Sequence, residues 1–309
     1  MNSINVKIIV FLILFLPFLA ISQEYVDILK IGYSHTFDAK FEGTDQSTDV
    51  KGFEASLTFP VVLSEKHVFI TGANFSAHTL QLFPNAVYTD LYSTTLKLGL
   101  ATTHSVKWGS TIVFLPKMAS DYKNISEDDF FYGAYAVAKL KKSENLIYRF
   151  GIYGSSEAFG PFATPIIGVY YKSPNKRFEI DASLPIVADV NYTFGTTTVG
   201  FDYFGIGRSF NISQDEFSEY YIEQSPLEFA GYIQLNTLQK SVLLRAKVGY
   251  TSNIHEVYEQ GDKLDIRISA FSFGDDRTQL NPDIKGSVFI KFEAIYRLHF
   301  EKTEKNLEN

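Results

Sequence analysis

Apolar and polar residues alternate with a repeat of two along most of the chain after residue 23. Successive side chains of a β-strand point to opposite faces, so this repeat predicts strands with one apolar and one polar face. A helix would instead show a 3.6-residue apolar stripe, and the sequence has no long stripe of that kind after residue 23. The clearest strand covers 288–300, where the apolar set is Val288, Ile290, Phe292, Ala294, Tyr296, Leu298 and Phe300.

The alternating segments predict about 14 strands, within a range of about 12 to 16, because an even number keeps both ends of a barrel on one side. Their expected spans are 26–40, 50–62, 66–80, 91–104, 107–118, 130–142, 146–155, 165–173, 176–184, 187–194, 197–210, 220–236, 240–252 and 286–300. Segment 264–273 is either a further strand or a hairpin in a long final loop. The fold class is therefore all-β, a closed antiparallel up-and-down barrel that crosses a membrane.

Three features favour this barrel over a soluble sandwich. The strands are often ten or more residues long, against about five or six in soluble sheets. Tyr and Phe recur near strand ends, as in the aromatic girdles of membrane barrels, and charges of both signs occupy the polar faces. Short and long connections alternate up to residue 176, with 119–129 and 155–164 among the long ones.

In such a barrel the apolar face meets lipid and the polar face lines the interior. A barrel of about 14 strands is wide enough to leave an open lumen unless a loop folds inward. The same charges could also form ion pairs that fill it. The residues expected to line the lumen are Lys30, Asp38, Glu54, Lys97, Arg149, Arg177, Glu179, Asp181, Arg245, Lys247, Asp265, Arg267, Lys291, Glu293 and Arg297.

The N-terminus is typical of an export signal. Lys7 supplies the positive region, an apolar run covers 8–16, and Ala20 and Ser22 stand at the positions preceding a cleavage site. We expect residues 1–22 to be a cleaved signal peptide, 23–300 to be the barrel and 301–309 to be a polar tail.

The last strand resembles that of the outer-membrane β-barrel proteins of Gram-negative bacteria, which usually end in an aromatic residue behind alternating apolar positions. Phe292, Tyr296, Leu298 and Phe300 match that signal, although nine residues follow Phe300. The chain looks like the single-domain outer-membrane barrels known only as domains of unknown function. The resemblance implies an outer-membrane location, with membrane lipid and the barrel-assembly machinery as partners, but it does not indicate an activity.

Composition narrows the remaining possibilities. Aromatic residues make up 16% of the 309 residues, the net charge is −7 and the mean hydropathy is −0.03. A polytopic helical membrane protein would be far more apolar, and the acidic balance argues against nucleic acid as a partner. The absence of Cys excludes a lipid-anchored lipoprotein and thiol chemistry.

Motifs for chemistry are weak. The sequence has no nucleophile elbow, zinc-protease motif or phosphate-binding loop, and we expect no catalytic residues, no metal ligands and no cofactor. Ser34-His35 and His104-Ser105 could serve a hydrolase, but neighbours on a strand point to opposite faces. The acidic segments 126–129 and 274–276 offer oxygen ligands without the spacing of a Ca²⁺ loop.

The sequence thus favours a passive channel or transporter for small polar solutes whose identity it does not reveal. The first alternative is a structural or surface-interaction barrel with a filled lumen. The second is an outer-membrane lipid hydrolase.

Overall fold

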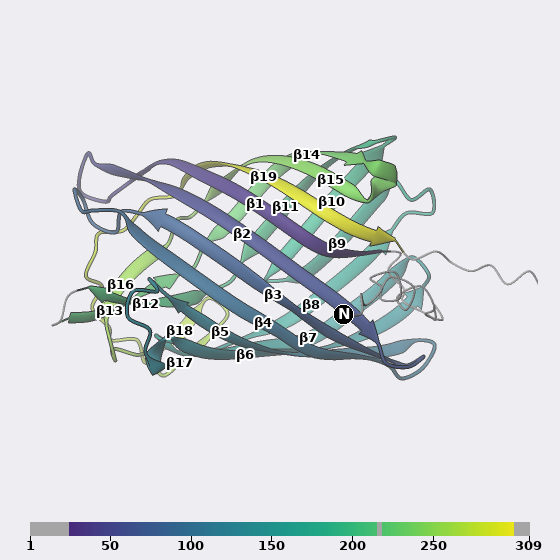
Figure 1. The fold of residues 1–309 in the computed structure, drawn as a ribbon, viewed down its shortest axis with the longest axis horizontal. Helices are drawn as coiled ribbons and strands as arrows, with labels where there is room; N and C mark the ends of the chain where they lie inside the picture. Colours follow the sequence, from purple (N-terminus) through teal and green to yellow (C-terminus); the bar gives the residue numbers. More distant parts are fainter. Residues whose placement is uncertain (1–24, 215–217, 300–309) are drawn as a thin grey trace, which may run out of the picture.

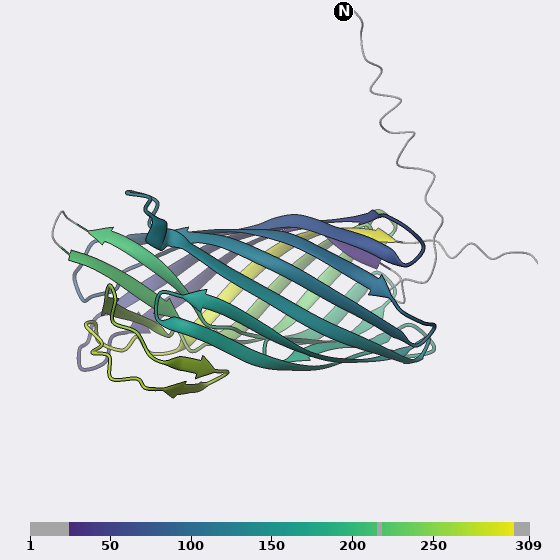
Figure 2. The same ribbon diagram turned by 90° about the horizontal axis from the view of Figure 1, so that it is seen from below.

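The computed structural model describes residues 25–214 and 218–299, which form an elongated β-barrel (Figures 1 and 2). Over these residues, 14 antiparallel strands build the wall, each paired with its neighbour, and the last pairs with the first from Tyr25↔His299 to Thr36↔Phe289. This confirms the predicted fold class and strand number. In ring order the wall strands are β1 (Tyr25–Lys40), β2 (Ser47–Val62), β3 (His67–Leu80), β4 (Thr89–Thr103), β5 (Trp108–Ser120), β6 (Phe130–Ser143), β7 (Leu146–Glu157), β8 (Gly160–Lys172), β9 (Phe178–Leu184), β10 (Val187–Phe194), β11 (Thr197–Gly205), β14 (Leu227–Thr237), β15 (Val242–Thr251) and β19 (Ser287–His299).

The barrel has two unlike ends. At the near end, where β1 begins and β19 ends, the connections are short, and one of them contains the 3₁₀ helix η2 (Leu238–Lys240). At the far end the connections include 81–88, 206–226, 252–286 and a loop with the 3₁₀ helix η1 (Glu127–Asp129). The predicted difference in length between the connections of the two ends is present, but the prediction of a long loop over 155–164 is wrong. There β7 and β8 continue to a two-residue turn at Ala158 and Phe159, because the pairing runs to Glu157↔Gly160.

The outer face of the wall is apolar. Alternate residues of each strand carry large apolar side chains that remain exposed in the isolated chain, such as Ile112 at 59% and Ile233 at 58%. An aromatic row crosses the outer face of three strands, with ring centroids 6.3 Å apart for Phe53 and Phe75 and 6.4 Å apart for Phe75 and Tyr92. Intervening residues face inward, as the alternation predicts.

Three strands leave the wall at the far end and form a separate small sheet, which we call the cap: β12 (Arg208–Gln214), β13 (Ser218–Gln224) and β16 (His255–Glu259). The predictions of single strands over 197–210 and 220–236 are therefore wrong in part. In each, one part belongs to the wall, as β11 or β14, and the other belongs to the cap, as β12 or β13. The chain turns out of the wall at Ile206 and Gly207, and β11 pairs directly with β14 down to Gly205↔Leu227. Glycines on both sides of Ile206 weaken the strand at that bend.

The cap packs against the inner surface of the wall. Phe210 and Ile222 of the cap are fully buried, and they share one apolar cluster with inward-facing wall residues such as Leu80, Leu91 and Phe131. A loop has therefore folded inward and covers the far end of the lumen with an apolar core.

The strands β17 (Ile266–Ile268) and β18 (Phe271–Phe273) form a hairpin. This hairpin extends the wall at the far end, beyond the short strand β9. β9 pairs only with residues 167–172 of β8, and nearer the far end β17 takes the place beside β8, with Arg267↔Phe162 and Ile268↔Ala163. In Figure 2 this hairpin lies beside the wall. Of the two alternatives for segment 264–273, the hairpin in the final loop is the correct one.

Candidate functional site

The candidate site is the interior of the barrel, and its centre is an ion-pair network around Glu293 of β19. The Glu293 side chain is fully buried, and its carboxylate oxygens lie 2.8 Å from Lys30 Nζ and 3.1 Å from Lys247 Nζ. Lys247 also pairs with Asp202, and Lys291 lies 2.6 Å from Glu54. The predicted lumen residues in this network are Lys30, Glu54, Lys247, Lys291 and Glu293, and each of them forms an ion pair inside the barrel.

The central network covers one side of the inner wall. Arg245 Nη1 lies 3.2 Å from Asp189 of β10, and the Arg245 guanidinium stacks 3.9 Å from the centroid of the Tyr232 ring. These pairs join strands at most three places apart in the ring. Beside the network, Lys97 of β4 donates to the hydroxyls of Ser56 and Thr58 on β2, and not to a carboxylate. The network therefore follows the wall of the lumen.

A second group of polar side chains constricts the near end. The Tyr25 hydroxyl of β1 donates a 2.5 Å hydrogen bond to Glu179 of β9, and the shorter way round the ring between these strands passes β19, β15, β14, β11 and β10. Arg297 binds Asp27 at 2.5 and 3.0 Å and stacks on the Tyr25 ring at 3.6 Å. The hydrogen bond between Tyr25 and Glu179 reaches across the barrel, so it narrows the opening of the lumen at the near end.

Four of the predicted lumen residues lie elsewhere or in a different context. Asp38 is exposed at a β-bulge, with a φ of 48°, because one extra residue shifts the alternation between Thr36 and Ala39. Arg177 is exposed in a near-end turn, and Asp265 is exposed in the final loop.

Arg267 faces inward and pairs with Glu223, but it lies on β17 of the far-end hairpin and not on one of the 14 wall strands. Arg149 lies on wall strand β7, 2.5 Å from Asp181 of β9. Of the predicted assembly signal, Phe292, Tyr296 and Leu298 lie on the outer face of β19 with exposed side chains, and Phe300 lies outside the described residues.

The sequence did not point to Glu157, which fastens the cap to the wall. Its side chain is fully buried at the end of β7, and its carboxylate accepts hydrogen bonds from Lys117 Nζ at 2.8 and 2.7 Å and from Ser155 Oγ at 2.9 Å. On the cap side, both the backbone N–H and the hydroxyl of Ser209 donate to it at 2.8 Å. A buried carboxylate with this many donors is a strong anchor.

A second anchor joins the cap to the final loop. Glu223 of β13 is 1% exposed and pairs with Arg267 and, at 3.1 Å, with Arg277. Arg277 also donates to the Tyr221 hydroxyl at 2.9 Å. Burial raises the pKa of Tyr221 to about 12, so this phenol stays protonated and donates to the Asp262 carbonyl at 2.6 Å.

A chain of polar side chains runs through the middle of the cap. Arg208 Nε donates to Gln224 at 2.5 Å, and Gln224 Nε2 lies 2.9 Å from His255 Nε2. The other ring nitrogen of His255 lies 3.1 Å from the Asn253 carbonyl oxygen, which makes it the donor, so Nε2 accepts from Gln224. Burial lowers the pKa of His255 to about 4, and the neutral ring is the form that fits this chain of hydrogen bonds.

The residues weighed for catalysis do not form a site. His35 points outward and lies 3.1 Å from Asp49, and His104 lies in an exposed near-end turn, 2.8 Å from Ser110 Oγ. Among residues 25–214 and 218–299, no three acidic, His or Cys side chains gather as metal ligands, and no helix of this part is long and apolar enough to cross a membrane.

Comparison with known proteins gives similarity of overall architecture at low identity. No protein-family model and no curated protein matches the sequence. Among solved structures, the chain is similar to the P. putida toluene transporter TodX, with 10% identity, a TM-score of 0.37 and coverage of 89% of both chains. It is also similar to a bacterial polysaccharide outer membrane secretin, with 8% identity, a TM-score of 0.36 and coverage of 90% of this chain and 100% of that one. For Acinetobacter baumannii OccAB3 the identity is 8%, the TM-score 0.32 and the coverage 88% and 98%.

Proposed function

We propose that this chain is an outer-membrane β-barrel that acts as a passive channel for small polar solutes and is held closed by its own cap. The observation that carries the proposal is the inward-folded cap, which places an apolar core over a lumen lined with paired charges. A closed wall leaves no unpaired strand edge, which is the requirement for β-structure in lipid. The exposed apolar outer face supplies the surface that lipid would cover.

The inner wall supports a solute path. The central ion pairs join strands at most three places apart, so they line the barrel and leave the space between opposite walls to the cap and to the near-end contact. In the closed state two features obstruct this path: the cap, held by Glu157, and the contact between Tyr25 and Glu179. Passage requires the cap to move.

The contact between Tyr25 and Glu179 favours one other candidate, a structural barrel with a filled lumen, because it ties opposite parts of the wall together. The two candidates differ in what the cap does. In a gated channel the cap blocks a path, whereas in a structural barrel its removal exposes a lumen that is still closed.

The wall pairing allows a clean test. Gly205 and Leu227 are register partners of β11 and β14, so residues 206–226 can be replaced by an Asn-Gly turn that joins the two strands as an ordinary hairpin. The wild type, this deletion of the cap strands β12 and β13, and the deletion combined with Tyr25→Ala would be reconstituted in liposomes, and swelling in small sugars would be measured. The proposal predicts slow swelling for the wild type, faster swelling for the deletion and the fastest for the combination. Swelling of both variants at the rate of protein-free liposomes would favour the filled lumen.

A further inference from the structure

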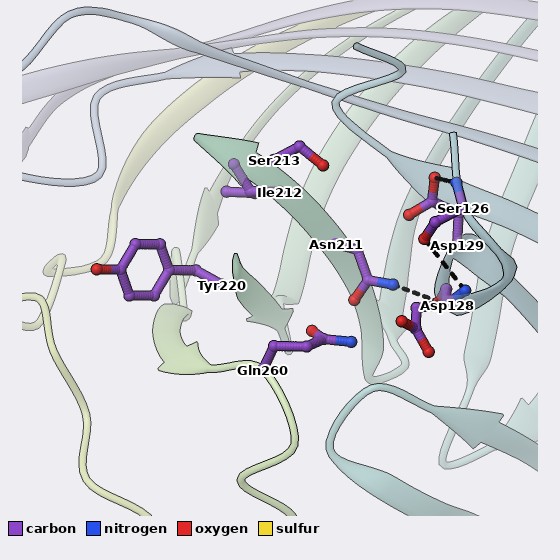
Figure 3. A pocket seen from close by; sticks show the side chains of 8 residues that line it. All are labelled: Ser126, Asp128, Asp129, Asn211, Ile212, Ser213, Tyr220 and Gln260. Atoms are coloured by element: carbon purple, nitrogen blue, oxygen red, sulfur yellow. Dashed lines mark hydrogen bonds between the residues drawn. The ribbon is translucent and has the colours of Figure 1, made fainter. Parts of the chain in front are cut away.

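A shallow pocket lies where four segments meet at the far end: the loop that contains η1, strands β12 and β13 of the cap, and Gln260 just after β16 (Figure 3). The loop belongs to the wall side and the other three segments to the cap side. The lining residues are Ser126, Asp128, Asp129, Asn211, Ile212, Ser213, Tyr220 and Gln260.

The loop side of the pocket is acidic and poorly compensated. Asp129 is 2% exposed, and its carboxylate accepts one backbone hydrogen bond, from Ser126 at 3.1 Å. Behind it, Asp121 is 5% exposed, its Oδ2 has no hydrogen-bond donor, and its ion-pair contact with the largely exposed Lys123 is 3.9 Å long. Burial raises the pKa of Asp121, backbone hydrogen bonds from Lys123 and Ser213 partly oppose this, and the charge of the neighbouring Asp129 adds a smaller upward contribution. Two buried carboxylates thus lie close together at this point.

The cap side supplies acceptor oxygens that have no donor. Asn211 is 6% exposed, and its amide nitrogen donates to the backbone carbonyl of Asp128. That bond fixes the orientation of the amide, because the reverse orientation would set its oxygen against the Asp128 carbonyl oxygen. The Asn211 Oδ1 is therefore an acceptor without a partner, and so is the Oε1 of Gln260. Buried polar atoms are normally hydrogen-bonded, so two acceptor oxygens without donors in one pocket suggest a bound ligand that contacts both.

We propose that this pocket binds a calcium ion that joins the cap to the η1 loop. Ca²⁺ takes oxygen ligands from carboxylates, side-chain amides, backbone carbonyls and water, and it accepts irregular geometry. Asp128 and Asp129 supply the charge, and Asn211 and Gln260 supply neutral oxygens. Since no three acidic side chains gather in the described residues, the amide oxygens and water complete the ligand set. The site is separate from the lumen, so it stands whether or not the barrel conducts.

The test is a Ca²⁺ titration of the full-length refolded barrel in detergent after chelator treatment, by isothermal calorimetry. Terbium luminescence excited through tyrosine gives a second readout, because Tyr220 lines the pocket. We expect saturable binding of one ion by the wild type. Absence of saturable binding to the folded wild type would overturn the proposal, and this result does not depend on any variant folding.

Matched variants locate the site. Asp128→Asn and Gln260→Met should each weaken Ca²⁺ binding by about tenfold or more, since affinity follows ligand charge and number. Glu127→Gln makes the same change of charge as Asp128→Asn one residue away, outside the pocket lining, and should leave the dissociation constant within about twofold. Equal weakening by Asp128→Asn and Glu127→Gln would contradict the proposal and indicate general attraction of cations to an acidic loop.

Discussion

Replacement of Glu157 by Gln should release the cap while the wall stays folded. The carboxylate is fully buried and receives Lys117 on one side and Ser209 on the other. Gln has nearly the same volume, so the change adds no cavity. Each carboxylate oxygen accepts from Lys117, so either orientation of the new amide puts a donor nitrogen against the ammonium group.

The magnitude follows from the loss of one partner of a buried pair, which costs about 3–5 kcal/mol. We expect the lower end, about 3 kcal/mol, because the Lys117 side chain is 12% exposed and can regain some hydration. Since about 1.4 kcal/mol is a factor of ten, the population of the released cap should rise about 100-fold.

Hydrogen exchange read by mass spectrometry measures this directly. Amides of the β12–β13 ladder should exchange about 100-fold faster in the variant, whereas amides of β3 and β4 serve as the internal reference. Glu259→Gln is the matched control, because Glu259 is an exposed residue of the same cap. Equal exchange of the cap in the wild type and in Glu157→Gln would refute the assignment of Glu157 as the anchor.

Three further predictions concern other parts of the molecule. Ile233→Lys, on the outer face, should lower the free energy of unfolding in lipid by about 2–4 kcal/mol if that face meets the membrane, and Val106→Lys, in a near-end turn, should not; chemical denaturation of the refolded barrel measures both. Lys291→Met should lower the free energy of unfolding in the same denaturation assay by about 1 kcal/mol, because it leaves Glu54 without its partner while the Glu54 side chain is 36% exposed and partly hydrated. The combination with Glu54→Gln should recover part of this loss. The lowered pKa of His255 means that the unfolded chain binds a proton between about pH 6.5 and 4 while the folded cap does not, so cap stability should fall by about 3 kcal/mol as the pH drops through this window. Hydrogen exchange of the cap amides across this pH range should show a smaller slope in His255→Gln than in the wild type, and an unchanged slope would contradict the assignment.

The wall could be predicted from the sequence because each strand is long and has one polar, inward face and one apolar, outward face, as in β19. The cap could not, because its strands alternate with the same repeat of two, and the segment from Thr197 to Phe210 reads as one strand. The one local signal was the sequence Gly205-Ile206-Gly207, which marks the bend.

The central ion pairs could be expected as a group, since charges of both signs fall on the inner face. Their partners could not, and neither could the anchor, because Glu157 and Ser209 are 52 residues apart. Asp38 shows another limit of alternation, since one bulged residue moves every following side chain to the other face.

The most direct test of a capped channel is single-channel recording in planar bilayers of two proteins, the wild type and the variant in which an Asn-Gly turn replaces residues 206–226 and Ala replaces Tyr25. The account predicts a wild type that is closed for most of the recording and a deletion variant with steady open-channel current. A deletion variant that inserts into the bilayer and carries no current would contradict it.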